Sequence, residues 1–257
     1  NARGQDARAP GEGAFRGTQP LSGPFDDDAL AKGSLAHAIL QDVDFSCRFN
    51  DNDLPYADYL RKSAGKETEA LLKIIGDEDI SPECVAAVRR DISSFFNFPD
   101  PLKDYFRPDS SFMPEHKIYF SAGAGTEVYV DGVIDLVVMA ADGRIAVIDY
   151  KYGRNSRDKA SFYEDQLKMY CLGISKAEGI DISNIRAFLV FLRDGAEVRE
   201  VDVSNDSLAS FEDYLEKTAA DILSTLPSED SCQQNRELCR YLSCPYLDRC
   251  SAADESV

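Results

Sequence analysis

The chain lacks long hydrophobic runs and an export signal. Nothing among its 257 residues approaches the ~18 consecutive apolar residues that a membrane-spanning helix needs. No basic segment precedes an apolar one near the start, so no signal peptide is visible. We therefore expect a cytoplasmic protein that makes no contact with a membrane.

Positive charge is also scarce. The chain has 28 Lys and Arg against 46 Asp and Glu, which gives a net charge of −18. Because contacts to phosphate need basic side chains, this balance argues against a free-standing nucleic-acid-binding protein. The Gly-x-x-x-x-Gly-Lys-Ser/Thr loop is absent as well, so the chain is not an NTP-driven motor of that type.

The cysteines do not suggest a disulfide framework, because their number is odd and no export signal accompanies them. Four of the seven crowd into the last 26 residues, namely Cys232, Cys239, Cys244 and Cys250. This crowding predicts a metal or cluster site. Free thiols packed as small hydrophobic groups are the alternative.

The sequence does contain enough apolar residues, 44%, for a sizeable core. Its signals run in the order helices, strands, helix, strand, helix, which predicts an α/β fold with a central mixed β-sheet flanked by helices. We expect a flexible linker or tag remnant over residues 1–25, a helical elaboration over 26–112, the core over 113–226 and a Cys-rich tail over 227–257.

Local signals place the individual elements. Ser81-Pro82-Glu83 is a helix start, with a capping serine, proline at the first helical position and then an acid. Helices are predicted over 26–40, within 56–98, over 161–172 and over 208–223. Strands are predicted over 117–120, 127–130, 133–139, 145–151 and 187–192. Turn signals stand at 123–125, Asp131-Gly132 and Asp142-Gly143.

Two acids and a lysine lie at the ends of two neighbouring strands. Alternation in a strand places Asp149 and Lys151 on one face, and Asp135 lies inside the apolar run of the preceding strand. A carboxylate in such a run is costly unless it is paired or bound to a cation. A two-residue turn between the strands would set Asp135 opposite Tyr150, whereas a three-residue loop or a bulge sets it opposite Asp149. A metal site requires the second register.

Such a set suits phosphodiester hydrolysis. Carboxylates hold a hard divalent cation through oxygen, and a bound cation lowers the pKa of water and neutralises charge that develops on phosphorus. The lysine can orient the attacking water or stabilise the transition state. An ordinary surface ion pair between Asp149 and Lys151 is the alternative.

Four motifs in order carry a family resemblance. They are Gly33-x-x-x-His37, Gly132-x-x-Asp135, Ile148-Asp149-Tyr150-Lys151 and Gln166-x-x-x-Tyr170. Together they resemble the PD-(D/E)XK nuclease superfamily, most closely its RecB-like branch, over residues 32–250. The resemblance implies a restriction-endonuclease-like core and a deoxyribonuclease that depends on Mg²⁺ or Mn²⁺.

The resemblance also assigns roles to residues. His37, Asp135 and Asp149 would bind the metal, together with the backbone carbonyl of Tyr150, and Lys151 would be the catalytic lysine. A packed interior histidine is the alternative for His37.

Further members of the site follow from the same resemblance. Gln166 and Tyr170 are four residues apart, so a helix presents them on one face, which in the family borders the active site. Glu115 matches an acid that is often found before a strand. The loop after the lysine is basic and would contact DNA through Arg154, Arg157 and Lys159, unless it is simply a solvated charged loop.

The C-terminal cysteines resemble the tail of iron-sulfur members of this branch, where a 4Fe-4S cluster is bound. The spacing differs here, since four residues separate Cys239 from Cys244 and no cysteine precedes Gly33. Cys232 would then have to supply a ligand.

The resemblance leads to an expected function. It implies an exonuclease module that acts on single-stranded DNA, at the C-terminal end of a UvrD/RecB-type helicase-nuclease in bacterial DNA repair, with the helicase motor upstream. The alternatives are a stand-alone exonuclease of the CRISPR-adaptation type and a catalytically inactive DNA-binding scaffold.

Overall fold

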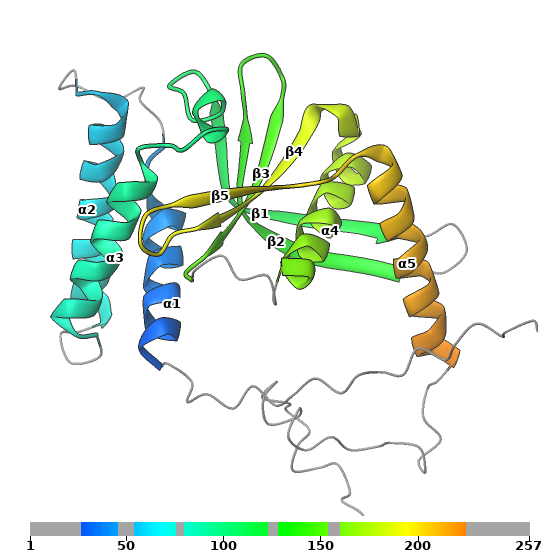
Figure 1. Ribbon diagram of the computed structural model, residues 1–257, viewed down its shortest axis with the longest axis horizontal. Coiled ribbons are helices and arrows are strands. Elements are labelled where there is room, and N and C mark those ends of the chain that lie inside the picture. Colours follow the sequence, from blue (N-terminus) through cyan, green and yellow to red (C-terminus); the bar gives the residue numbers. More distant parts are fainter. Residues whose placement is uncertain (1–26, 46–53, 76–79, 123–127, 154–159, 225–257) are drawn as a thin grey trace, which may run out of the picture.

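The computed structural model describes residues 27–45, 54–75, 80–122, 128–153 and 160–224 (Figure 1). Its helices are α1 (Asp27–Asp42), α2 (Tyr56–Ile75), α3 (Pro82–Phe95), α4 (Ala160–Glu178) and α5 (Asn205–Ser224). Its strands are β1 (Ser111–Ala122), β2 (Val128–Met139), β3 (Ile145–Lys151), β4 (Ile185–Phe191) and β5 (Glu197–Val201).

The five strands form one sheet in the order β1-β2-β3-β4-β5. All neighbours pair antiparallel except β3 and β4, which are parallel and are joined through α4. This is the mixed sheet flanked by helices that the sequence predicts. The parallel pair explains why every residue of β3 except Lys151 is buried, because both faces of such a pair are covered by helices.

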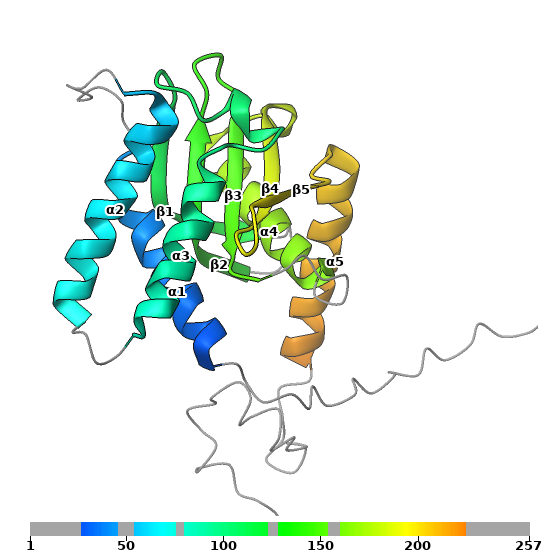
Figure 2. The same cartoon turned by 60° about the vertical axis from the view of Figure 1, so that its left-hand side comes forward.

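Helices cover the sheet on both sides (Figures 1 and 2). On one side α1, α2 and α3 pack with Leu136, Ile148 and Tyr150 in one apolar cluster. On the other side α4 and α5 pack with Val137 and Val147 in a second cluster. Each sheet face is therefore buried against its own group of helices.

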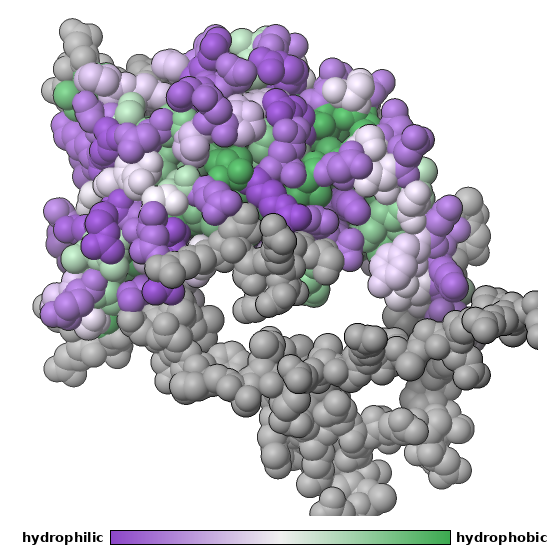
Figure 3. Space-filling model, viewed as in Figure 1, coloured by the Kyte–Doolittle hydropathy of each residue, from purple (hydrophilic) through white to green (hydrophobic). Residues whose placement is uncertain are grey.

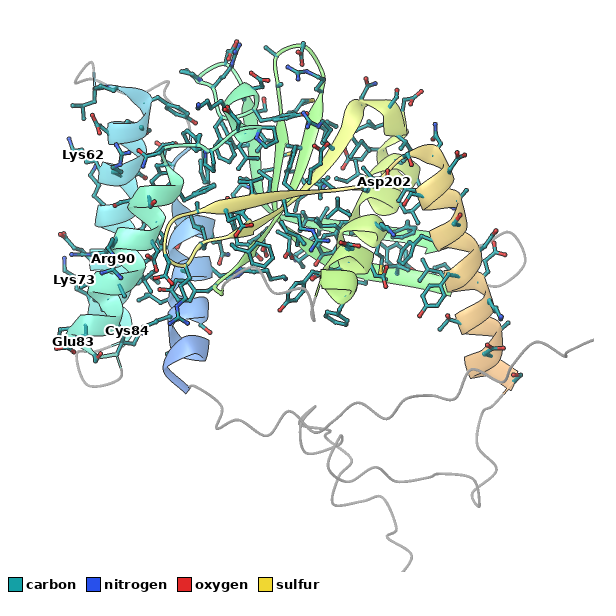
Figure 4. All side chains as sticks on the ribbon, in the orientation of Figure 1. Lys62, Lys73, Glu83, Cys84, Arg90 and Asp202 are labelled. Carbon is teal, nitrogen blue, oxygen red and sulfur yellow. The ribbon has the colours of Figure 1, made fainter. Side chains whose placement is uncertain are left out.

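The outer faces of α2 and α3 are charged. Figure 4 shows Lys62, Lys73, Glu83 and Arg90 projecting from these helices away from the sheet, and all four are exposed. Ser81 caps α3 as predicted, since its side chain accepts a hydrogen bond of 3.1 Å from the Cys84 amide. No helix in the described part of the chain is long and apolar enough to cross a membrane.

The predicted Asp131-Gly132 turn is wrong. Both residues lie inside β2, which is one continuous strand where the sequence suggests two. The glycine serves close packing instead, because a Cβ at position 132 would lie only 3.3 Å from Cε1 of Tyr170.

Two strands differ from the sequence prediction in extent or existence. β1 begins six residues before the predicted start at Lys117, and its pattern is broken by Pro114 and by Glu115, which has a φ of 50°. β5 was not predicted, because Glu197, Arg199 and Glu200 make it look like a polar loop. It is an edge strand, where charged residues are common.

Candidate active site

The strand register brings the two predicted acids together. Leu136 lies opposite Ile148 and Val137 opposite Val147, so the next position sets Asp135 opposite Asp149. The amide of Ala140 donates to the carbonyl of Arg144 at 2.9 Å, which leaves a three-residue loop over 141–143. Gly143 has a φ of 87° there, a conformation that favours glycine. The register that a metal site requires is thus confirmed.

Asp135 is the point where β2 leaves β3. One carboxylate oxygen, Oδ2, accepts a hydrogen bond of 2.7 Å from the Tyr150 amide, beyond the last backbone pairing of the two strands. The alternation of β2 is also interrupted here, since Ile134 packs in the cluster of α4 and Leu136, two residues on, packs in the cluster of α1–α3. The side chain of Asp135 therefore ends the pairing and stays available at the strand edge.

His37 approaches Asp135 from α1. Its Nδ1 lies 3.5 Å from Oδ1 of Asp135, and its ring packs edge-on against the ring of Tyr150 at a centroid distance of 6.2 Å. The hydrogen bond with Asp135 raises the pKa of His37, although burial of the ring opposes this. The Gly33 spacing also has a reason, because a Cβ at position 33 would already contact Cβ of Tyr152 at 3.6 Å.

Asp149 is the most deeply buried acid of the site, with 2% of its side chain exposed. Burial raises its pKa to about 6, and the attraction of Lys151 partly offsets that effect. The Lys151 Nζ lies 2.6 Å from Oδ2 of Asp149, but the contact is an ion pair without hydrogen-bond alignment. A buried carboxylate oxygen without an aligned donor is suited to a cation.

A polar chain runs from Lys151 into α4. The Lys151 ammonium donates to Oε1 of Gln166 at 3.1 Å, and Nε2 of Gln166 donates to the Tyr170 hydroxyl at 2.8 Å. The prediction that Gln166 and Tyr170 share a helix face beside the site is confirmed. Since the Tyr170 oxygen accepts from Gln166, its own hydrogen is free to be donated elsewhere.

One neighbour of the lysine was missed by the sequence analysis. The ring of Tyr163 lies under Lys151, with Nζ 4.8 Å from the ring centroid. Tyr163 comes three residues before Gln166 on α4, so helical spacing places both on one face. That spacing could have identified it.

Glu115 is the remaining candidate of the site and lies on β1. Glu115 is flanked by the pairs Pro114–Leu136 and His116–Ile134, so it lies opposite Asp135 on the neighbouring strand. Its side chain is half-buried. Its role as a ligand stays a prediction. His116, also on β1, bonds to Glu178 at 2.7 Å.

The described residues contain no ready-made group of three or more His, Cys, Asp or Glu in metal-binding geometry. Asp135 is held by His37 and the Tyr150 amide, and Asp149 by Lys151, so each carboxylate turns toward its own partner. The donor set still fits a hard divalent cation, because it offers carboxylate oxygens and an imidazole around the unaligned Oδ2 of Asp149.

Several predicted residues lie outside the described ranges. They are Arg154, Arg157 and Lys159 of the basic loop and Cys232, Cys239, Cys244 and Cys250 of the tail. The predicted DNA contacts and the predicted cluster are therefore untested, as is the Tyr150 carbonyl as a ligand.

Two carboxylates on one rung, with a lysine anchored beside them at the edge of a mixed sheet, define a hydrolytic nuclease site. The model of the PD-(D/E)XK nuclease superfamily matches residues 15–251. The chain belongs to this superfamily, whose members generally use divalent metals such as Mg²⁺.

Two solved structures are distantly similar to this chain. An Eubacterium rectale protein, provisionally named an exonuclease, is 11% identical, covers 94% of this chain and 97% of its own, and superposes with a TM-score of 0.46. The protein SSO0001 is 14% identical over 81% of this chain and 84% of its own, with a TM-score of 0.36. No curated protein matches the chain.

Proposed function

We propose that this domain is a metal-dependent deoxyribonuclease that hydrolyses phosphodiester bonds. The observation that carries the proposal is the rung of Asp135 and Asp149 with Lys151 fixed between Asp149 and Gln166. A surface ion pair would not need a buried acid, and Asp149 is almost fully buried.

Mg²⁺ or Mn²⁺ would be held by Asp135, Asp149 and His37, with the Tyr150 carbonyl and Glu115 as further ligands. The bound ion supplies an acidified water and neutralises charge on the phosphate. Burial around Asp149 strengthens such binding, because a cation relieves the cost of a desolvated carboxylate.

The side chains around the ion have separate tasks. Lys151 places its ammonium where negative charge develops on the phosphate, and Gln166 keeps the lysine there. Burial raises the pKa of Tyr170, so its hydroxyl keeps its proton at neutral pH and can donate it to a phosphate oxygen. His37 holds the orientation of Asp135.

The finer proposal is an exonuclease acting on single-stranded DNA, as the C-terminal module of a UvrD/RecB-type helicase-nuclease in DNA repair. The order of the four motifs and the net charge of −18 support it, since an acidic domain gains from a partner that delivers the strand. A stand-alone exonuclease of the CRISPR-adaptation type accounts for the same motifs.

The test is cleavage of end-labelled single-stranded and duplex DNA with Mg²⁺, Mn²⁺ or EDTA. Wild type is compared with Lys151→Ala and Asp149→Asn, and with Lys168→Ala, which changes a lysine of α4 that lies near Phe211. We expect cleavage only with metal, a loss of at least about 100-fold in both site variants, and normal activity in Lys168→Ala.

Equal activity of wild type, Lys151→Ala and Asp149→Asn would refute the assignment. Metal-dependent DNA binding without cleavage would indicate the inactive scaffold instead. Strands labelled at the 5′ end and strands labelled at the 3′ end distinguish exonuclease from endonuclease action, because an exonuclease releases first the label at the end where it starts.

A further inference from the structure

A pair of exposed tyrosines stands on the β1–β2 hairpin. Tyr119 is 64% exposed and Tyr129 57%, although both are large aromatic side chains. Their rings lie 5.9 Å apart and are within 5° of parallel. The two rings therefore present an ordered aromatic surface to solvent.

The tyrosine pair lies on the face of the hairpin that is turned away from α4. Ile118, Phe120 and Ile134 point to the α4 side, so alternation sends Tyr119 and Tyr129 to the other side of the sheet, where α1 packs and from which His37 reaches Asp135. Tyr119 pairs with Asp131, four residues before Asp135. At about 3.4 Å per residue, Tyr119 stands roughly 14 Å from the carboxylate along the strand, and Tyr129 stands roughly 20 Å from it.

Packing needs do not explain this surface fully. Cross-strand aromatic pairs do stabilise hairpins, but the opposite face of the hairpin is already packed through Ile118 and Phe120. The charged neighbours on the tyrosine face, Lys117 and Asp131, balance each other. On a chain with a net charge of −18, these two described charges add no net negative charge to this face.

We propose that Tyr119 and Tyr129 form a stacking platform for the unpaired bases of the DNA strand that enters the active site. The proposal rests on the nuclease function above and specifies its substrate as single-stranded. Every base offers a π-face to an aromatic ring, so such binding tolerates any sequence and needs no basic patch. Duplex DNA, whose bases are stacked on each other, cannot use the platform.

A fluorescent probe can report the contact directly, because the chain contains no tryptophan. In a Lys151→Ala background that blocks cleavage, Tyr129→Trp places a single indole on the platform and keeps the stacking. Tyr214→Trp is the matched control, since Tyr214 is 56% exposed but lies on α5. We expect an oligo-dT strand to quench the first indole and not the second, and a duplex of equal length to quench neither.

Steady-state kinetics give the second measurement. Tyr119→Val with Tyr129→Val keeps strand-forming residues and removes both rings. We expect the KM for single-stranded DNA to rise about fivefold or more, with kcat retained. The slope of log KM against log salt should stay the same, since no phosphate contact is lost.

Failure of this proposal is distinguishable from failure of the nuclease assignment. Cleavage with unchanged KM in the double valine variant, or equal quenching of the two indoles, would overturn the platform and leave the nuclease standing. Cleavage unaffected by Lys151→Ala would remove the nuclease assignment, whereas the quenching experiment measures binding and stands by itself.

Discussion

At the residue scale, the buried charge of Asp149 governs how stability depends on pH. Its pKa is about 6 in the folded protein and ~4 in an unfolded chain, so the folded state holds the proton more tightly. Protonated Asp149 therefore contributes its full share to the free energy of unfolding below pH ~4, and this contribution is lost as pH rises through about 6. We expect the metal-free protein to melt at a lower temperature at pH 7 than at pH 5.

The Asp149→Asn variant isolates this effect. Replacing the buried carboxylate by an amide should stabilise the metal-free protein at pH 7 by on the order of 2 kcal/mol, while cleavage is lost. Thermal unfolding in EDTA from pH 5 to 8 measures it, with Asp131→Asn, an exposed change in β2, as the control. A variant that melts below wild type at pH 7 would show that Lys151 already compensates the charge.

The chain's two histidines provide a matched pair. His37 contacts Asp135, whereas His116 bonds to Glu178 at the far end of α4. We predict that His37→Ala raises the Mn²⁺ concentration for half-maximal cleavage at least about tenfold, and that His116→Ala leaves it unchanged. A metal titration of the cleavage rate decides, and identical curves for both variants would exclude His37 as a ligand.

Most of the site residues could be predicted from the sequence, because each acts through a chemical group at fixed spacing. Asp149 and Lys151 are two residues apart on a strand, and Gln166 and Tyr170 are four apart on a helix. Tyr163 was missed because a tyrosine on a helix usually packs, although its helical spacing from Gln166 could have identified it. Its contact with Lys151 depends on how α4 lies on the sheet.

At the scale of elements, the position of α4 depends on one glycine. A Cβ on Gly173 would lie 2.6 Å from Cδ1 of Ile118 and 3.1 Å from the ring of Phe120. We predict that Gly173→Ala destabilises the protein by about 1–3 kcal/mol, because the well-packed contact of α4 with β1 must open. Urea unfolding measures this. Gly65→Ala on α2, where a Cβ meets nothing within 4 Å, should be neutral or stabilising.

Element boundaries were less predictable than element types. The Asp131-Gly132 pair looks like a turn because the sequence does not reveal that Tyr170 packs over Gly132. β5 looks like a loop because only pairing with β4 makes its alternating charges a strand. Both errors come from contacts between residues that are distant along the chain.

At the scale of the whole molecule, the net negative charge of the protein weakens the binding of DNA, which is also negatively charged. Figure 3 shows one face that is mostly hydrophilic, and the chain carries an excess of 18 negative charges. Reversing three exposed acids far from the site, Glu69→Lys, Asp109→Lys and Asp213→Lys, changes the net charge from −18 to −12. We predict a lower KM for single-stranded DNA with kcat unchanged.

Salt provides the control for this prediction. At ~0.15 M ionic strength, charges farther apart than about 8 Å are largely screened, so the advantage of the triple variant should shrink with added salt. A gain in KM that persists at high salt would point to new direct contacts instead of a long-range field.

The length of the three-residue loop between β2 and β3 sets the register of these two strands. Ala141, Asp142 and Gly143 are exposed and make no contact with the acids of the site, yet their number decides which residue stands across from Asp149. One residue more or fewer would exchange the partners along the whole strand. Related sequences with the same chemistry should therefore vary positions 141 and 142, keep a residue that tolerates a positive φ at position 143, and keep the number of loop residues.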